Sequence, residues 1–212
     1  MPITTVLFDL DGTIVDTNEL IVRSFLHTLE GETERAFTRE DIIPHMGFAL
    51  MEQLRFFTGQ EQVDELAVKY RTFNQSKHDE LVTEFPHVPE VLAELARRGI
   101  RMGVVTNKIR QTTLMGLRLC GIESYMETIV TADDVARGKP DPEAVLKALE
   151  QLGVAPEEAL MVGDSKYDII AGRDAGVKTV GVSWSLKGEE HLRSFDPDYI
   201  IHDMKDLLEI VR

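Results

Sequence analysis

Short apolar runs typical of buried β-strands alternate with amphipathic helical patterns along most of this chain. The runs are TTVLFDL (4–10), RMGVVTN (101–107), TIVTAD (128–133), EALMVGD (158–164), VKTVGVSW (177–184) and DYIIHD (198–203). Two helical patterns between them, residues 88–99 and 142–153, end at glycines, which suit a helix C-terminus. Strands that alternate with helices of about ten residues predict an α/β fold in which helices cover both faces of a parallel sheet.

The alternation fails between residues 16 and 82, where helical patterns follow one another without an intervening strand. The first of them carries an apolar stripe at helical spacing, formed by Ile21, Val22, Phe25, Leu26 and Leu29. We therefore expect an all-helical cap (16–82) inserted after the first strand of a core formed by residues 1–15 and 83–212. The two crossings, near residues 14–17 and 80–86, are expected to act as hinges. The Met and Phe residues of 46–57 are expected to form the cap core.

The charge balance restricts the partners of the chain. Twenty-three basic and thirty-seven acidic residues give a net charge of −14, which disfavours nucleic acid or an anionic membrane as a partner. An anionic substrate would need local cations.

We expect Cys120, the only cysteine, to be a buried structural thiol. No signal-peptide core or membrane span is evident, so a cytoplasmic protein is expected; the sequence does not indicate its oligomeric state.

Polar side chains gather directly after three of the apolar runs. In an open parallel sheet, ligands bind outside the carboxyl ends of the strands, so these residues are candidates for a common site. They are Asp9, Asp11, Gly12, Thr106, Asn107, Lys108, Asp164 and, one helical turn later, Asp168, together with Lys139 in RGKPDP.

Asp9 and Asp11 raise an electrostatic question. If strand geometry continued through FDLDGT, the two carboxylates would point to the same side. At ~6 Å and an effective dielectric of ~20 their repulsion would cost about 2–3 kcal/mol. A divalent cation bound by Asp9, Asp11 and Asp164 would relieve that repulsion. Clustered carboxylates without a neighbouring histidine or cysteine suit Mg²⁺ rather than zinc.

The same groups suit phosphoryl transfer. Mg²⁺, a lysine and hydroxyl donors neutralise and position a phosphoryl group, with Thr106 and Lys139 as the phosphate ligands. Asp9 could then attack phosphorus to give an aspartyl-phosphate. Asp11 could protonate the leaving oxygen and later deprotonate the water that hydrolyses the intermediate. Gly12 and Asn107 are expected to contribute main-chain N–H groups, so that their side-chain identity says little about the chemistry.

At this point the chain resembles the haloacid dehalogenase-like (HAD-like) phosphohydrolases. Their four motifs occur in order as DLDGT (9–13), VVTN (104–107), Lys139 in GKPDP and GDSKYD (163–168). The resemblance implies a Rossmannoid core with a helical cap. It also implies Asp9 as nucleophile, Asp11 as acid and base, and Thr106 and Lys139 on the phosphate. Mg²⁺ would lie on Asp9, the Asp11 carbonyl and Asp164, with Asp168 supporting the metal or the lysine.

A narrower resemblance concerns the substrate. Two segments are similar to those of inorganic pyrophosphatases of this family: TNELIVRSFLHTLEG at the entry of the cap and YRTFNQSKHDELV at its exit. The resemblance implies an enzyme that removes the pyrophosphate released when seryl-phosphorylated HPr is dephosphorylated. Pyrophosphate hydrolysis is therefore the leading hypothesis. Phosphoglycolate or a sugar phosphate as substrate, and a sugar-phosphate mutase, are the alternatives. A phosphate-binding regulatory protein without turnover would be expected to lose Asp11 or Lys139, and both are present.

Four further residues are candidates for substrate contact, each with an ordinary structural explanation beside the functional one. Arg71 and His78, with Lys77 beside His78, could reach a second phosphate group when the cap closes, or could be solvated helix residues. Gly47 could shape the loop that faces the site, or end a helix. Lys108 could contact substrate because it follows Asn107 directly.

Overall fold

The computed structural model describes residues 2–211, and a six-stranded sheet forms the centre of this part of the chain. Every neighbouring pair of its strands is parallel. Across the sheet the order is β5 (Thr128–Val130), β4 (Arg101–Val105), β1 (Thr5–Phe8), β6 (Ala159–Gly163), β7 (Lys178–Val182) and β8 (Tyr199–Ile201). Each apolar run of the sequence contains one of these strands, so the predicted parallel sheet is confirmed.

Helices cover both faces of the sheet, as β1 shows. Val6 and Phe8 belong to the apolar cluster shared with α5 (Val88–Arg97), α6 (Arg110–Leu119) and α10 (Leu207–Ile210). Leu7, which points to the other face, belongs to the cluster shared with α7 (Glu143–Leu152) and α8 (Lys166–Asp174). This alternation follows from the two-residue period of a strand. The short helix α9 (Glu189–Arg193) follows β7 and packs against it.

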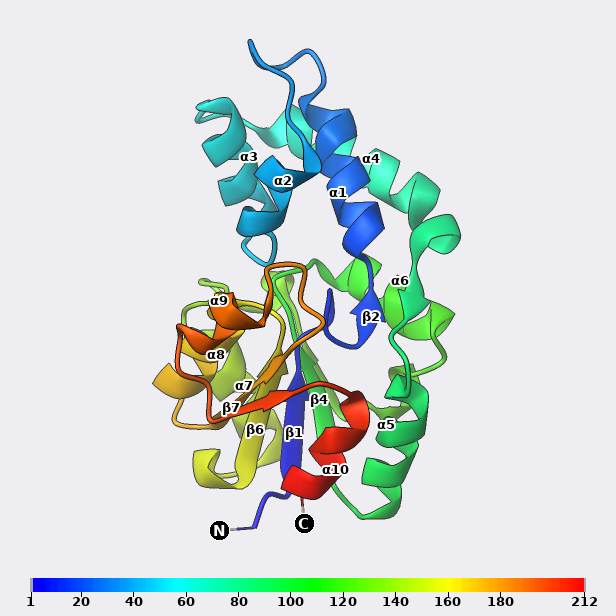
Figure 1. Ribbon diagram of the computed structural model, residues 1–212, viewed down its shortest axis with the longest axis vertical. Coiled ribbons are helices and arrows are strands. Elements are labelled where there is room, and N and C mark those ends of the chain that lie inside the picture. Colours follow the sequence, from blue (N-terminus) through cyan, green and yellow to red (C-terminus); the bar gives the residue numbers. More distant parts are fainter. Residues whose placement is uncertain (1, 212) are drawn as a thin grey trace.

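The cap is helical and is joined to the core by a small ladder. Its helices are α1 (Asn18–Leu29), α2 (Arg39–Ile42), α3 (Leu50–Thr58) and α4 (Asp64–Leu81). Before and after them, β2 (Val15–Asp16) and β3 (Thr83–Glu84) pair antiparallel. Two-residue strands carry no periodic signal, so the sequence did not predict this ladder. Figure 1 shows the cap above the carboxyl ends of the sheet strands, with both chain ends at the opposite pole.

Single turns of 3-10 helix complete the structure. They are η1 (Ile43–His45), η2 (Glu123–Tyr125), η3 (Ala132–Asp134), η4 (Pro156–Glu158) and η5 (Met204–Asp206). Within residues 2–211, no helix has the length and apolar character that crossing a membrane requires.

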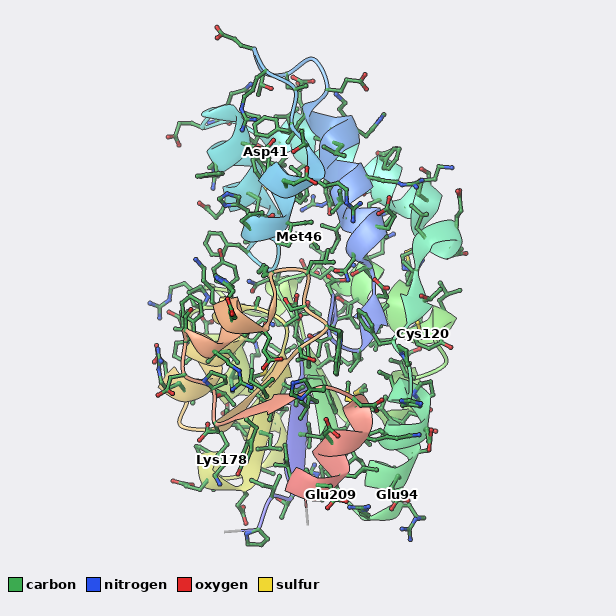
Figure 2. The ribbon with its side chains drawn as sticks, in the orientation of Figure 1. Asp41, Met46, Glu94, Cys120, Lys178 and Glu209 are labelled. Atoms are coloured by element: carbon green, nitrogen blue, oxygen red, sulfur yellow. The ribbon has the colours of Figure 1, made fainter. Side chains whose placement is uncertain are left out.

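The cap has its own apolar core, separate from the two clusters of the sheet. Phe25 lies at its centre, with ring centroids 5.5 Å from Phe57 and 4.7 Å from Tyr70. Met46 joins this core at the edge of the cap that faces the sheet (Figure 2). The prediction for residues 46–57 is wrong in part, because Phe56 is 64% exposed. Phe48 stacks on Tyr167 of α8 with 5.0 Å between ring centroids, so this residue packs on the core domain.

Cys120 directly follows α6 and is half-buried rather than fully buried. Burial, followed by the charge of Glu84, raises the pKa of the Cys120 thiol to about 11. The thiol is therefore protonated at neutral pH, as suits a structural rather than a nucleophilic cysteine.

Candidate active site

Asp9, Thr106 and Asp164 meet where three adjacent central strands end. Asp9 follows β1, Thr106 follows β4 and Asp164 follows β6, and the sheet order places β1 between the other two strands. The three side chains are buried, with 6%, 3% and 6% of their residues' surface exposed. The topology therefore brings together residues that the sequence separates by up to 155 positions.

Lys139 is the cation at the centre of this group. Its ammonium is buried and donates to Asp9 Oδ1 at 2.7 Å, to Asp168 Oδ1 at 2.5 Å and to the Val105 carbonyl at 2.7 Å. These contacts use all three donors of the ammonium. Burial alone would lower the pKa of Lys139, but Asp168 and Asp9 outweigh burial and raise it. The lysine is thus a fixed positive charge beside Asp9.

Asp168 holds this lysine and also begins α8. Its Oδ2 accepts from the Ser165 N–H at 3.0 Å and from Ser165 Oγ at 2.5 Å, which forms a capping box. Both carboxylate oxygens of Asp168 are therefore engaged by protein donors. Asp168 thus contacts Lys139, one of the two groups that it is expected to support, and its role stays a prediction.

Three buried carboxylates surround the lysine. Oxygen atoms of Asp9, Asp164 and Asp168 lie within 4.8 Å of one another. Burial raises the pKa of Asp9 well above its ordinary value, and Asp168 and Asp164 raise it further against the opposing effect of Lys139. Burial is also the main cause that raises the pKa of Asp164 to about 6. Lys139, together with Lys187, whose charge also acts on Asp164, supplies two positive charges against three carboxylates, so this set of hard oxygen donors fits a divalent cation.

Asp11 occupies a different environment from Asp9, although only Leu10 separates them. The chain turns after β1, with the Gly12 N–H donating to the Val15 carbonyl at 3.0 Å. Asp11 Oδ1 then accepts from Thr17 Oγ1 and from Lys108 Nζ, both at 2.7 Å. The two aspartates therefore do not share a strand face, and each has its own lysine. This pairing relieves their repulsion even before any cation binds.

Gly12 is required for the close approach of this turn to β6. It has φ +80°, and a Cβ atom built on it would lie 2.8 Å from Asp164 Oδ2. Its N–H is already used within its own turn. The contribution of Gly12 is therefore the absence of a side chain rather than the phosphate-binding N–H that the sequence suggested.

The side chain of Asn107 joins three parts of the molecule. Asn107 Oδ1 accepts from the Lys139 N–H at 2.8 Å, while Nδ2 donates to the Lys139 carbonyl at 2.8 Å and to the Gly47 carbonyl of the cap at 3.0 Å. The sequence assigned no role to this side chain itself, whereas the structure shows these three hydrogen bonds. Its contacts could not be read from the sequence, because they join loops 32 and 60 residues away.

A cavity between cap and core opens onto Asp9 and Asp11. It encloses about 730 Å³ when space open to solvent is included. Thr106, Asn107 and Lys108 line it from the core, and Gly47 and Arg71 line it from the cap. Arg71 Nε is buried and has no hydrogen-bond partner within residues 2–211.

Two of the candidate cap residues lie away from this cavity. His78 is buried, with its Nδ1 2.8 Å from Asp79 Oδ1. Its Nε2 faces Gly116 of α6, 3.9 Å from the position of a built Cβ. Lys77 is paired with Glu80 on the exposed side of α4. The structure therefore brings neither residue to the site.

The sequence did not identify Phe48 as a site residue, although Phe48 lines the cavity and stacks on Tyr167.

The fold and the site together define a hydrolase of the HAD-like type. They combine a parallel sheet, a buried aspartate after its central strand, a lysine bound to that aspartate and a helical cap above the site. The chain belongs to that family, because the family model described as "Haloacid dehalogenase-like hydrolase" matches residues 6–182.

The relatives are more specific. "Pyrophosphatase PpaX" of Bacillus velezensis is 50% identical over 208 residues, covering 98% of this chain and 96% of the relative. "Pyrophosphatase PpaX" of Bacillus cereus is 48% identical over 211 residues, covering 100% and 97%. A solved structure of a haloacid dehalogenase-like family hydrolase from Streptococcus pneumoniae superposes with a TM-score of 0.88 at 25% identity, covering 99% of each chain. The expected resemblance to pyrophosphatases of this family is thereby confirmed.

Proposed function

We propose that this protein hydrolyses inorganic pyrophosphate to phosphate. The observation that carries the proposal is the buried Asp9 carboxylate, which Lys139 holds at the floor of a small cavity between core and cap. Relatives that cover the whole chain and are named pyrophosphatases support the choice of substrate. Cations around the cavity would attract an anion to a protein whose net charge is −14.

In the proposed reaction an Asp9 carboxylate oxygen attacks one phosphorus atom of pyrophosphate. The bond from that phosphorus to the bridging oxygen breaks, and the departing phosphate takes a proton from Asp11 if it needs one. Asp11 then removes a proton from water, and the hydroxide attacks the aspartyl-phosphate to release the second phosphate and restore Asp9. The contacts of Asp11 with Thr17 and Lys108 support this role, because they hold the carboxyl group beside the cavity.

Phosphate binding is assigned to neighbouring donors. Thr106 Oγ1 and the main-chain N–H of Asn107 would contact the oxygens of the transferred phosphoryl group. The Lys139 ammonium, whose three N–H groups contact Asp9, Asp168 and Val105, would exchange its contact with Asp9 for a phosphate oxygen. Mg²⁺ would be held by the Asp9 and Asp164 carboxylates and the main-chain carbonyl of Asp11, and would neutralise phosphate charge. The burial of two carboxylates with raised pKa values supports a resident cation.

We further propose that residues 16–82 move as a cap on a core formed by residues 1–15 and 83–212. The β2–β3 ladder would be the hinge, and closure would exclude water from the phosphoenzyme. Arg71, whose Nε lacks a partner within the described chain, would reach the phosphate group that is not transferred. In the cell the substrate would be the pyrophosphate released when seryl-phosphorylated HPr is dephosphorylated, as the cap resemblance suggests.

A substrate panel tests the proposal. Phosphate release is measured from pyrophosphate, phosphoglycolate, several sugar phosphates and p-nitrophenyl phosphate, with Mg²⁺ and with excess chelator. We expect pyrophosphate to give the highest kcat/KM and the chelator to abolish turnover. A higher value for phosphoglycolate would refute the substrate assignment, and a need for a bisphosphate activator would indicate a mutase. Stabilisation by fluoroberyllate with Mg²⁺, without any turnover, would indicate a regulatory phosphate-binding protein.

A further inference from the structure

The loop between β7 and α9, residues 183–188, lies beside the candidate active site although it belongs to none of the four motifs. In the register of β6 with β7, Gly163 is opposite Gly181, so the two strands end at the same edge. Ser185 Oγ donates to the Asp164 carbonyl at 2.7 Å and accepts from the Lys187 N–H at 3.3 Å. Ser185 therefore ties the main chain of Lys187 to the residue that follows β6.

The Lys187 ammonium is buried and unpaired. Its Nζ is screened from solvent and makes no hydrogen bond within residues 2–211. Its charge nevertheless acts on the core and on the cap. It opposes the burial that raises the pKa of Asp164, and after burial and Lys166 it helps to lower the pKa of His45 in η1. The ammonium therefore lies near the boundary where cap and core meet above Asp164.

A buried ammonium without a hydrogen-bond partner is costly, and an anion bound there would offset that cost. The other two lysines of the site each have a carboxylate partner. Lys139 is bound to Asp9 and Asp168, and Lys108 is bound to Asp11. Lys187 Nζ makes no such hydrogen bond to a carboxylate within the described chain, although its charge acts on Asp164. On the cap, Arg71 Nε is likewise buried without a partner among residues 2–211.

We propose that Lys187 is a substrate-binding residue that pairs with the phosphate group of pyrophosphate that is not transferred to Asp9. This inference rests on the proposed function and deepens it. A phosphomonoester has one phosphoryl group, for which Thr106 and Lys139 already supply donors. Pyrophosphate brings a second anionic group, which requires cations outside that set. Lys187 therefore favours the diphosphate over monoesters.

The test compares Lys187→Met and Lys187→Arg with wild type on pyrophosphate and on p-nitrophenyl phosphate. Methionine keeps the apolar stem and removes the charge. We expect kcat/KM for pyrophosphate to fall at least about tenfold in Lys187→Met, mainly through KM, and to fall at least about threefold more than kcat/KM for p-nitrophenyl phosphate. Lys187→Arg should recover part of the loss. Equal losses on both substrates would overturn the proposal, since they would show that Lys187 only balances the charge of Asp164. Unchanged kinetics on both would overturn it too.

The matched control is Lys178→Met. Lys178 is an exposed lysine at the opposite end of β7, far from the cap (Figure 2). This control variant should keep wild-type kinetics on both substrates.

Competition separates this proposal from the proposed function. Inhibition of p-nitrophenyl phosphate hydrolysis by pyrophosphate is measured in wild type and in Lys187→Met. If wild type does not turn over pyrophosphate, the proposed function fails, but a Ki at least about tenfold weaker in the variant still supports an anion contact at Lys187. An unchanged Ki would refute that contact. The rise in melting temperature that pyrophosphate causes should likewise be smaller in Lys187→Met, and an equal rise would count against the proposal.

Discussion

Replacing Asn107 by alanine should damage both stability and catalysis, because its side chain makes three hydrogen bonds between loops. Two of these bonds hold the main chain of Lys139, and the third reaches the carbonyl of Gly47 in the cap. At about 0.5–1.5 kcal/mol each, their loss should cost about 3 kcal/mol of unfolding free energy. For a chain of this length that cost corresponds to a fall in melting temperature of roughly 6–12 °C.

The catalytic effect should be larger than a loss of stability explains. The Lys139 ammonium makes contacts of 2.5–2.7 Å with Asp9, Asp168 and Val105, and a displacement of about 1 Å in its backbone would break them. A misplacement of that size costs on the order of 100-fold in rate, which we expect in kcat/KM at a temperature where the variant is folded.

The assay combines thermal unfolding with steady-state kinetics and uses Asp198→Ala as control. Asp198 accepts from the N–H and hydroxyl of Thr179 near the amino end of β7, so its loss should lower the melting temperature and leave kcat/KM unchanged. Our reasoning is wrong if Asn107→Ala melts within about 2 °C of wild type and retains more than half of its kcat/KM.

Three further predictions concern single residues. Asp9→Asn should abolish turnover while circular dichroism shows an intact fold, and substantial activity in a preparation free of wild type would exclude the covalent mechanism. Gly12→Ala should reduce both activity and the stabilisation by Mg²⁺, because its Cβ would lie 2.8 Å from Asp164 Oδ2 at φ +80°; wild-type stabilisation by Mg²⁺ in a melting assay would contradict this. Cys120 should react with iodoacetamide at pH 8 about 100-fold more slowly in the folded than in the unfolded protein, because its pKa is raised from 9.0 to about 11. Mass spectrometry measures this rate, and a difference below threefold would show that the thiol is not suppressed.

The architecture could be predicted from the sequence because its signals are local. Apolar runs and helical periodicity indicated the parallel sheet and the helical cap, and each pattern depends only on residues a few positions apart. The positions of Asp9, Thr106 and Asp164 at one edge also followed, since parallel strands end on the same side. The β2–β3 ladder did not follow, because two residues are too few to show a period.

The sequence by itself thus determined which side chains come to the edge of the sheet, whereas only the tertiary structure decided how they pair. Lys139 binds Asp9 across 130 positions, and Lys108 binds Asp11 across 97. The motif RGKPDP singles out Lys139, but nothing local shows that it binds Asp9, that Lys108 binds Asp11, or that the Lys187 ammonium is left unpaired. The partner of a buried charge depends on strand order and loop packing, which are set by the whole chain at once. For the same reason Asn107, a residue expected to act through its backbone, uses its side chain to join Lys139 to the cap.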